Sequence, residues 1–269
     1  MKSAFVRIAV SLALTLLLAH AALSWQVSYG LQPFGSFSGG PFDIVNNQDL
    51  NVHFAIPVLN KAGRGLPFNY SDGYDSTIWS IQNSAWTPAN QWGWPVGGFA
   101  PSFGYVYYDV TQGSCISGGQ TYYYNIYSYW NFAQPSNPGY ITPFSFTLSD
   151  ASVGTPCTGA PPYSATATAT DGSGVTISAT AQPSATIYYP SGNTLSPSLY
   201  WGGNPTTLTD TNGNQISGTV PSNRIITDTL GTTAITAQGQ GTPSSPVTFQ
   251  YTNAAGTTST ETEIGRAHV

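Results

Sequence analysis

Charged side chains are scarce in this chain of 269 residues, since Asp, Glu, Lys and Arg together make up only 6% of it. Soluble globular proteins average about 25%. A content this low excludes the highly charged kind of disordered chain. Gly, Pro, Ser, Thr and aromatic residues fill the composition instead, and these residues favour turns and strands. The composition therefore predicts an all-β protein.

Basic residues and histidine become scarcer still once both ends of the chain are set aside. The cations left between residues 22 and 263 are Lys61, Arg64 and Arg224, against 11 acidic residues, so the net charge is about −8. So few cations argue against nucleic acid or an anionic membrane as a partner. His53 is the one histidine left, and histidine is the commonest general base and metal ligand.

No apolar run reaches the length of about 20 residues that spans a bilayer. Residues 1–21 instead have the pattern of a signal peptide: Lys2 and Arg7 are basic, residues 8–18 are apolar, and Ala19-His20-Ala21 has small residues at the positions that precede cleavage. A retained anchor is the alternative. We expect a protein that is secreted or displayed at the cell surface, and no stable membrane span.

The C-terminal residues look artificial. Ile264-Gly265-Arg266-Ala267-His268-Val269 resembles the translation of a common sequencing adapter. We therefore expect residues 258–269 to be a truncated or artefactual tail, and the natural chain to continue differently after residue 263.

Cysteine is nearly absent as well, with Cys115 and Cys157 as its two members. One pair in an exported chain favours a disulfide, which would close a loop of about 40 residues and stabilise the fold by roughly 3–4 kcal/mol. Two buried free thiols are the alternative. The spacing excludes a CxxC-type metal or redox motif.

Alternation with a period of two predicts strands, and no convincing helical period occurs outside the signal segment. Strand-like runs cover residues 50–59, 66–74, 104–110, 121–132, 164–170, 175–181, 232–237 and 247–252. Ser114 to Gly119 is the expected connection of one hairpin, and Asn212-Gly213 is a strong turn signal in another. Large aromatics thin out near residue 160. We therefore expect two β-rich modules of sandwich-like or meander-like antiparallel sheets, an aromatic-rich one at 22–160 and a Thr/Gly-rich hairpin module at 161–257.

Several short motifs occur in an order that resembles the entry region of bacterial RHS/YD-repeat proteins. In the first half they are Gly40-Pro41-Phe42-Asp43-Ile44-Val45-Asn46, Asp49-Leu50-Asn51, Gly63-Arg64-Gly65-Leu66-Pro67-Phe68 and Tyr74-Asp75-Ser76. In the second half they are Ala169 to Gly174, Thr209 to Ile216, Thr227 to Gly231 and Gly241 to Thr248. Asp49 stands where the family has the glycine of a G-N-L motif.

The resemblance implies a function without catalysis. In that family, such a region precedes a shell of YD repeats in the same polypeptide and a variable C-terminal domain. No complete YD repeat occurs in this chain. The resemblance therefore implies a structural N-terminal region that plugs, caps or displays the downstream shell.

Candidate chemistry is sparse. The acidic residues beside turns are Asp72, Asp75, Asp171, Asp210 and Asp228. A glycosidase needs two carboxylates across a cleft, but aspartate is also a preferred turn residue. Residues 210–214 place oxygens as a calcium loop does, yet lack its distal glutamate, so a hairpin turn fits them better. Lys61 and Arg64 could bind an anion, although a solvated turn is favoured. We predict no catalytic residue, no cofactor and no metal site.

Tryptophan supports the main alternative, a carbohydrate-binding β-sandwich of an adhesin or hydrolase whose partners would be cell-surface glycans. Trp79, Trp86, Trp92, Trp94 and Trp130 are the candidate ligand-facing aromatics. Packing of these rings in the core and in loops is the interpretation that we favour.

Overall fold

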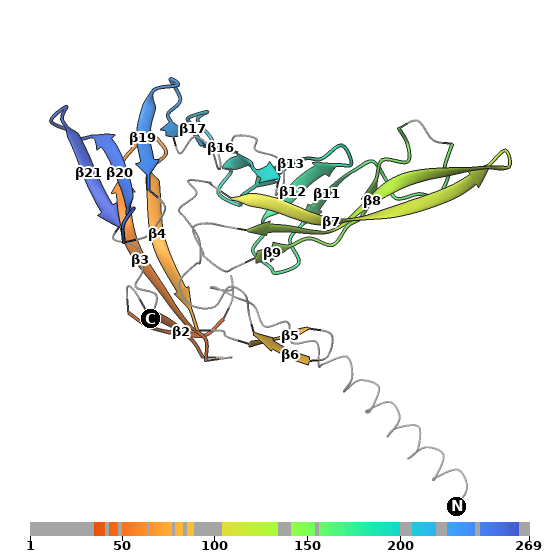
Figure 1. Cartoon of the computed structure of the whole chain (residues 1–269), viewed down its shortest axis with the longest axis horizontal. Coiled ribbons are helices and arrows are strands. Elements are labelled where there is room, and N and C mark those ends of the chain that lie inside the picture. The colour runs from red at the N-terminus through yellow and green to blue at the C-terminus, as the bar shows by residue number, and fades with distance from the viewer. Residues whose placement is uncertain are drawn as a thin grey trace, which may run out of the picture.

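A computed structural model describes residues 35–40, 43–47, 50–63, 65–76, 79–82, 85–88, 104–133, 141–153, 156–199, 206–218, 225–239 and 243–263. All regular elements in these ranges are β-strands (Figure 1). The predicted all-β fold is therefore confirmed for this part of the chain, and its residues include no helix long and apolar enough to cross a membrane. The predicted signal peptide lies outside the described residues.

The largest sheet has ten antiparallel strands in the order β11-β12-β13-β14-β16-β17-β18-β19-β20-β21, so that each strand pairs with the next one along the sheet. Its strands are β11 (Ser164–Thr168), β12 (Thr176–Thr180), β13 (Ser184–Tyr188), β14 (Thr194–Ser196), β16 (Thr206–Thr209), β17 (Gln215–Gly218), β18 (Ile225–Thr227), β19 (Thr233–Gln238), β20 (Val247–Thr252) and β21 (Thr258–Glu263). The sheet is a meander, because short turns favour antiparallel neighbours.

A second sheet is built on one long hairpin, β7 (Tyr105–Ser117) and β8 (Gln120–Ala133). Its further strands are β9 (Ile141–Pro143) and β10 (Leu148–Ser149), which pair with β8, and β15 (Ser198–Leu199), which pairs parallel to β7. The hairpin extends well beyond these short neighbours (Figure 1). The observed connection is shorter than the predicted one at Ser114 to Gly119, because the strands continue to a two-residue turn at Gly118 and Gly119.

Two smaller sheets come from the first part of the chain. One has the order β1 (Phe37–Gly39), β2 (Asp43–Asn46), β3 (Val52–Lys61) and β4 (Phe68–Asp75), and the other is the hairpin of β5 (Trp79–Gln82) and β6 (Ala85–Pro88). Pro57 lies inside β3 where β2 no longer pairs with it, at a register shift against β4. A proline fits there because an edge strand leaves a ladder donor unused.

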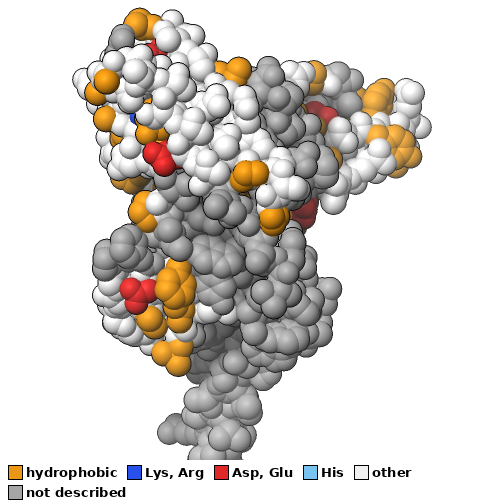
Figure 2. Space-filling model, turned by 60° about the vertical axis from the view of Figure 1, so that its left-hand side comes forward, with side chains coloured by type: hydrophobic (Ala, Val, Ile, Leu, Met, Phe, Trp, Pro, Cys, Tyr) orange, Lys and Arg blue, Asp and Glu red, His pale blue; other side chains and the backbone are white. Residues whose placement is uncertain are grey.

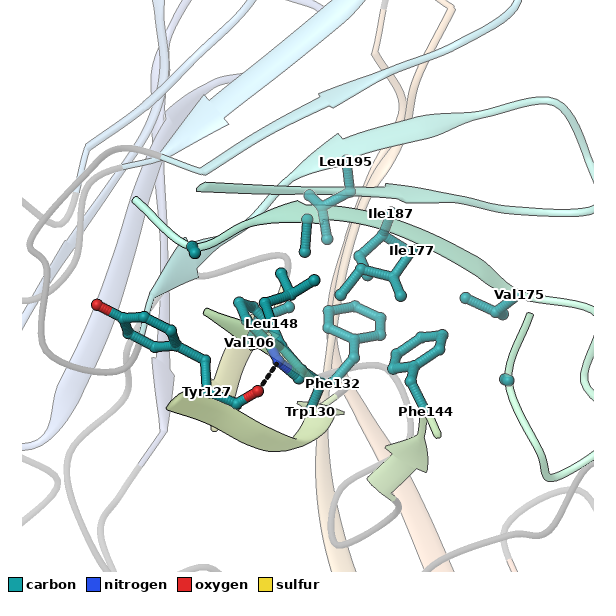
Figure 3. Packing of buried hydrophobic residues seen from close by; sticks show 13 residues of the cluster. Val106, Tyr127, Trp130, Phe132, Phe144, Leu148, Val175, Ile177, Ile187 and Leu195 are labelled. Carbon is teal, nitrogen blue, oxygen red and sulfur yellow. Dashed lines mark hydrogen bonds between the residues drawn. The ribbon is translucent and has the colours of Figure 1, made fainter. Parts of the chain in front are cut away.

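The first hydrophobic core lies between the β7–β8 sheet and strands β11 to β14. Trp130, Phe132 and Leu148 from the former meet Ile177 and Ile187 from the latter, and all five are fully buried (Figure 3). This core takes residues from both sides of residue 160. The composition of the chain changes near residue 160, but the hydrophobic packing continues across that point.

The second core lies under the other half of the ten-stranded sheet. Leu59, Leu66 and Phe68 of the β3–β4 hairpin pack on Ile226, Ile235, Phe249 and their neighbours in β17 to β20. In Figure 1 the β3–β4 hairpin lies beside β19, β20 and β21. Leu208 of β16 packs against both cores. One long meander is thus covered by two separate hairpins.

The predicted tail of residues 258–269 begins too early. Thr258–Glu263 form β21, which pairs with β20 over its whole length, from Thr252↔Thr258 to Val247↔Glu263. The run alternates threonine with serine or glutamate, a pattern that suits a strand with one face in solvent. Residues 264–269 lie outside the described residues.

Candidate functional site

Acidic side chains at the turns of the ten-stranded sheet are engaged in holding those turns. Both carboxylate oxygens of Asp210 accept hydrogen bonds: Oδ1 from the backbone N–H groups of Asn212 and Asn214, both at 2.8 Å, and Oδ2 from Asn214 Nδ2 at 2.7 Å. Asp228 Oδ1 accepts from Leu230 N and Thr232 N at 3.0 Å each. Within the described ranges, no group of three or more His, Cys, Asp or Glu side chains is placed to hold a metal.

The same turn occurs four times, at the same end of the strands in this sheet. Residues 189–193, 210–214, 228–232 and 253–257 join β13–β14, β16–β17, β18–β19 and β20–β21, and in each the fourth residue is a glycine with φ between 72° and 86°. That glycine donates its N–H to the carbonyl of the first residue at 2.9–3.1 Å. A type I turn followed by a left-handed residue has this geometry, and glycine is the residue that adopts it without strain.

The sequence motifs predict two of these four turns, and those at 189–193 and 253–257 are not among the predictions. Asn253 could have been found, because Asn253-x-x-Gly256 has the spacing of Asp210-x-x-Gly213 and an amide oxygen can replace the carboxylate. Asn253 Oδ1 indeed accepts from Ala255 N and Thr257 N at 3.0 and 3.1 Å. In the first turn Ser191 Oγ, which accepts from Asn193 N at 3.4 Å, is the side-chain acceptor.

We predict that an NMR titration of Asp210 will give a pKa below that of an ordinary aspartate. The hydrogen bond from the Asn214 side chain is the main cause, and it favours the ionised carboxylate. The stabilisation that this shift reflects is present above the unfolded-state pKa and is lost as the pH falls through the lowered folded-state pKa. Asn214→Ala should raise the Asp210 pKa, whereas Asn253→Ala should leave it unchanged; an unmoved pKa in Asn214→Ala would contradict the assignment.

A small recess opens between the β3–β4 turn and the ten-stranded sheet. Lys61, Gly63 and Leu66 line one side, and Gln215 and Asp228 line the other. Gly65, with φ at +106°, packs directly on the Asn214 side chain, since a Cβ at Gly65 would lie 2.3 Å from Asn214 Nδ2. The glycine-rich turn and the Asp210 turn therefore touch, although they are far apart in the sequence.

Replacing Gly65 by alanine should destabilise the fold more than the same change at a turn that touches nothing. The left-handed backbone costs an alanine roughly 1–2 kcal/mol, and the overlap with Asn214 adds about 1–3 kcal/mol. Gly256→Ala is the matched control, because its φ is +78° and no atom lies within 4 Å of its added Cβ. Urea unfolding of both variants measures the difference; equal losses would show that Gly65 and Asn214 are not in contact.

His53 is almost fully buried in β3, at 1% exposure, and its Cα partners in the neighbouring strands are Ile44 and Asp75. Lys61 lies at the rim of the recess, and Arg64 lies outside the described residues. Of the acidic turn residues, Asp228 shares the lining of this recess with Lys61.

Cys115 of β7 is joined to Cys157 by the disulfide that sequence analysis expects, with 5.7 Å between the Cα atoms. This bond attaches residues 156–159 to the projecting part of the β7–β8 hairpin, residues 109–128, which we call the arm. Asp150 holds the arm nearer its base, since its carboxylate accepts from Asn125 N at 2.7 Å and from Asn125 Nδ2 at 2.8 Å. The arm is thus attached at two points.

Aromatic rings pack tightly at the base of the arm. Trp130 has no exposed surface, stacks on Phe146 at 5.3 Å between ring centroids, and donates from Nε1 to the Tyr127 carbonyl (Figure 3). A ligand-facing role is therefore not open to Trp130. The side chains of Trp79 and Trp86, and Trp92 and Trp94 entirely, lie outside the described residues.

Burial raises the pKa of three tyrosines in this first core above the ordinary range: Tyr108, Tyr127 and Tyr189. The negative charge of Asp150 raises the pKa of Tyr127 further. A tyrosine is protonated at neutral pH in any case, and the raised pKa values reflect the packing of these three rings in the core.

The outer face of the arm is not among the sites predicted from the sequence. Val110 is 53% exposed, Ile116 76% and Tyr123 62%, and Figure 2 shows hydrophobic side chains gathered on the outer end of the projecting lobe. One signal could have found it: no charged residue occurs between Asp109 and Asp150. An exposed apolar face without charges is a candidate interaction surface.

The chain was compared with protein-family models, with curated proteins and with solved structures, and nothing in any of the three matches it.

Proposed function

We propose that this chain is the non-enzymatic N-terminal region of an exported RHS/YD-repeat-type protein. Its work would be to plug, cap or display the repeat shell that follows in the same polypeptide. This function requires a rigid β framework and no reacting groups. The carboxylates of Asp210 and Asp228, which are engaged in turns, are consistent with that requirement.

One contact carries the proposal. The Gly63–Phe68 turn and the Thr209–Ile216 turn both belong to the resemblance to RHS/YD-repeat proteins, and they pack on each other through Gly65 and Asn214. Leu66 and Phe68, directly after this turn glycine, enter the second core with Ile216. Because the two motifs pack in one core, each stabilises the other, and this explains why both occur in one protein.

The repeated turns give independent support. A meander whose hairpins reuse one three-residue turn is a regular unit, and regular units can be continued by adding another hairpin at the last strand. Such a framework suits a region that leads into an array of β repeats.

The decisive experiment is to amplify and sequence the gene past codon 263 from genomic DNA. We expect an open reading frame that continues into YD motifs and a C-terminal effector domain. A continuation into a catalytic or cell-wall-anchoring domain would contradict the proposal, and it would favour the carbohydrate-binding alternative. A stop codon directly after codon 263 would also contradict it, because no shell would follow.

A further inference from the structure

Within the residues that the structure describes, no strand pairs with the outer edge of β7 beyond Val106. Among the residues that the structure describes, β15 is the strand paired with that edge, and it reaches only Tyr105 and Val106. From Asp109 to Ser117 the strand contains no proline, no lysine and no arginine, which are the residues that commonly block edge pairing. By contrast β21, the last strand of the ten-stranded sheet, carries Glu261 and Glu263.

The turn of the arm fixes which backbone groups point outward. Gly118 and Gly119 have φ of 58° and 78°, as in a two-residue type I′ hairpin. In such a hairpin the residues that flank the turn exchange both backbone hydrogen bonds, and alternate pairs along the ladder do the same. The residues of β7 in the other pairs therefore turn their N–H and C=O groups away from β8: Val110, Gln112, Ser114 and Ile116.

The exposed side chains of this edge are arranged symmetrically about Gly113. Val110 lies three residues before it and Ile116 three residues after it, and both side chains are on the same face of the arm as Tyr123. Two antiparallel copies of β7 that cross at Gly113 would therefore place Val110 opposite Ile116 twice. Such a contact uses the same patch on both molecules, as a twofold dimer requires.

Charge makes the arm the surface on which two copies meet with least repulsion. The whole chain is acidic, so two copies repel each other over most of their surface. The arm is an exception, because Asp109 is the one charged residue of β7 and would face Ser117 of the second copy in this register. Pairing would also convert a two-stranded arm into a four-stranded sheet, which is more stable than an isolated hairpin.

We propose that β7 pairs antiparallel with β7 of a second copy of this chain, in the register that places Val110 opposite Ile116. The contact is an interaction surface of the arm, and it does not depend on the RHS/YD-repeat assignment.

Sedimentation velocity of the purified chain, with its disulfide intact, over a wide concentration range tests the proposal. We expect a monomer–dimer equilibrium. Gln112→Pro removes an outward N–H without removing a bond to β8, and it should weaken the dimer by about tenfold or more. Thr121→Pro is the matched control, because Thr121 lies on the same face but on the edge of β8, and this variant should dimerise normally.

A charge exchange tests the register. Val110→Glu alone and Ile116→Lys alone should each weaken the dimer, since each places a charge opposite an apolar residue. The double variant should restore it, because the introduced carboxylate of one copy would face the introduced ammonium group of the other. Within one copy the two positions are some 20 Å apart, so the two new charges cannot pair there.

Several outcomes would overturn the proposal. They are a monomer at every concentration, a dimer that Gln112→Pro leaves unchanged, or a double variant no stronger than the singles. A monomer whose arm binds a neutral polysaccharide through Tyr123 would replace the second copy by a glycan. Recovery in the double variant sustains the proposal even if both proline variants fail to fold.

Discussion

Trp130→Ala is expected to cost about 3–5 kcal/mol of unfolding free energy. The indole ring is fully buried, stacks on Phe146, and lies 4.5 Å from the Tyr108 ring between centroids. Its removal leaves a cavity where the β7–β8 sheet meets the ten-stranded sheet. The loss is a large part of a total stability of about 5–15 kcal/mol. Urea unfolding followed by far-UV circular dichroism measures it.

Tyr129→Ala is the matched control, because Tyr129 is the adjacent residue and is 73% exposed. It should change the free energy of unfolding by no more than about 0.5 kcal/mol. Equal losses from the two variants would show that Trp130 is not the centre of the core. A folded Trp130→Ala variant that had lost glycan binding would instead support the carbohydrate-binding alternative.

Tyr129 also explains where the strand pattern departs from simple alternation. Its φ is +53°, and it lies at a β-bulge where Tyr129 and Trp130 together oppose Tyr108 of β7. The extra residue changes which side chains face the core, so Tyr122 and Trp130 do not share an environment although their spacing is even. A period-two pattern cannot reveal such an insertion, because the bulge depends on pairing with the other strand.

Strands and turns with strong local signals could be predicted, but their assembly could not. Val247–Thr252 was predicted at its observed bounds, and the Asn212-Gly213 turn connects β16 and β17 as expected. The short strands β14 and β18 were missed, since three residues contain too little pattern. The covering of one meander by two hairpins, and the contact of Gly65 with Asn214, depend on long-range packing that alternation does not encode.

Removing the disulfide with Cys115→Ser and Cys157→Ser together is expected to cost roughly 3–4 kcal/mol, because the bond closes a loop with a sequence separation of 42 residues and restricts the unfolded chain. The double variant avoids a leftover free thiol. Denaturant unfolding of the oxidised protein and of this variant, under the same conditions, gives the difference.

The structural effect should be confined to the arm. Hydrogen exchange should become faster in residues 109–128, because a hairpin with one face exposed is marginally stable without its staple. At Trp130, Phe132 and Ile177, whose core lies at the base of the arm and does not include Cys115, exchange should become faster only by the loss of global stability. Ser114→Ala, which changes a neighbouring exposed residue of β7, is the control and should leave exchange unchanged. A loss of protection in the first core that exceeds the fall in global stability measured with denaturant would show that the disulfide supports the packing of the two sheets and not the projecting hairpin.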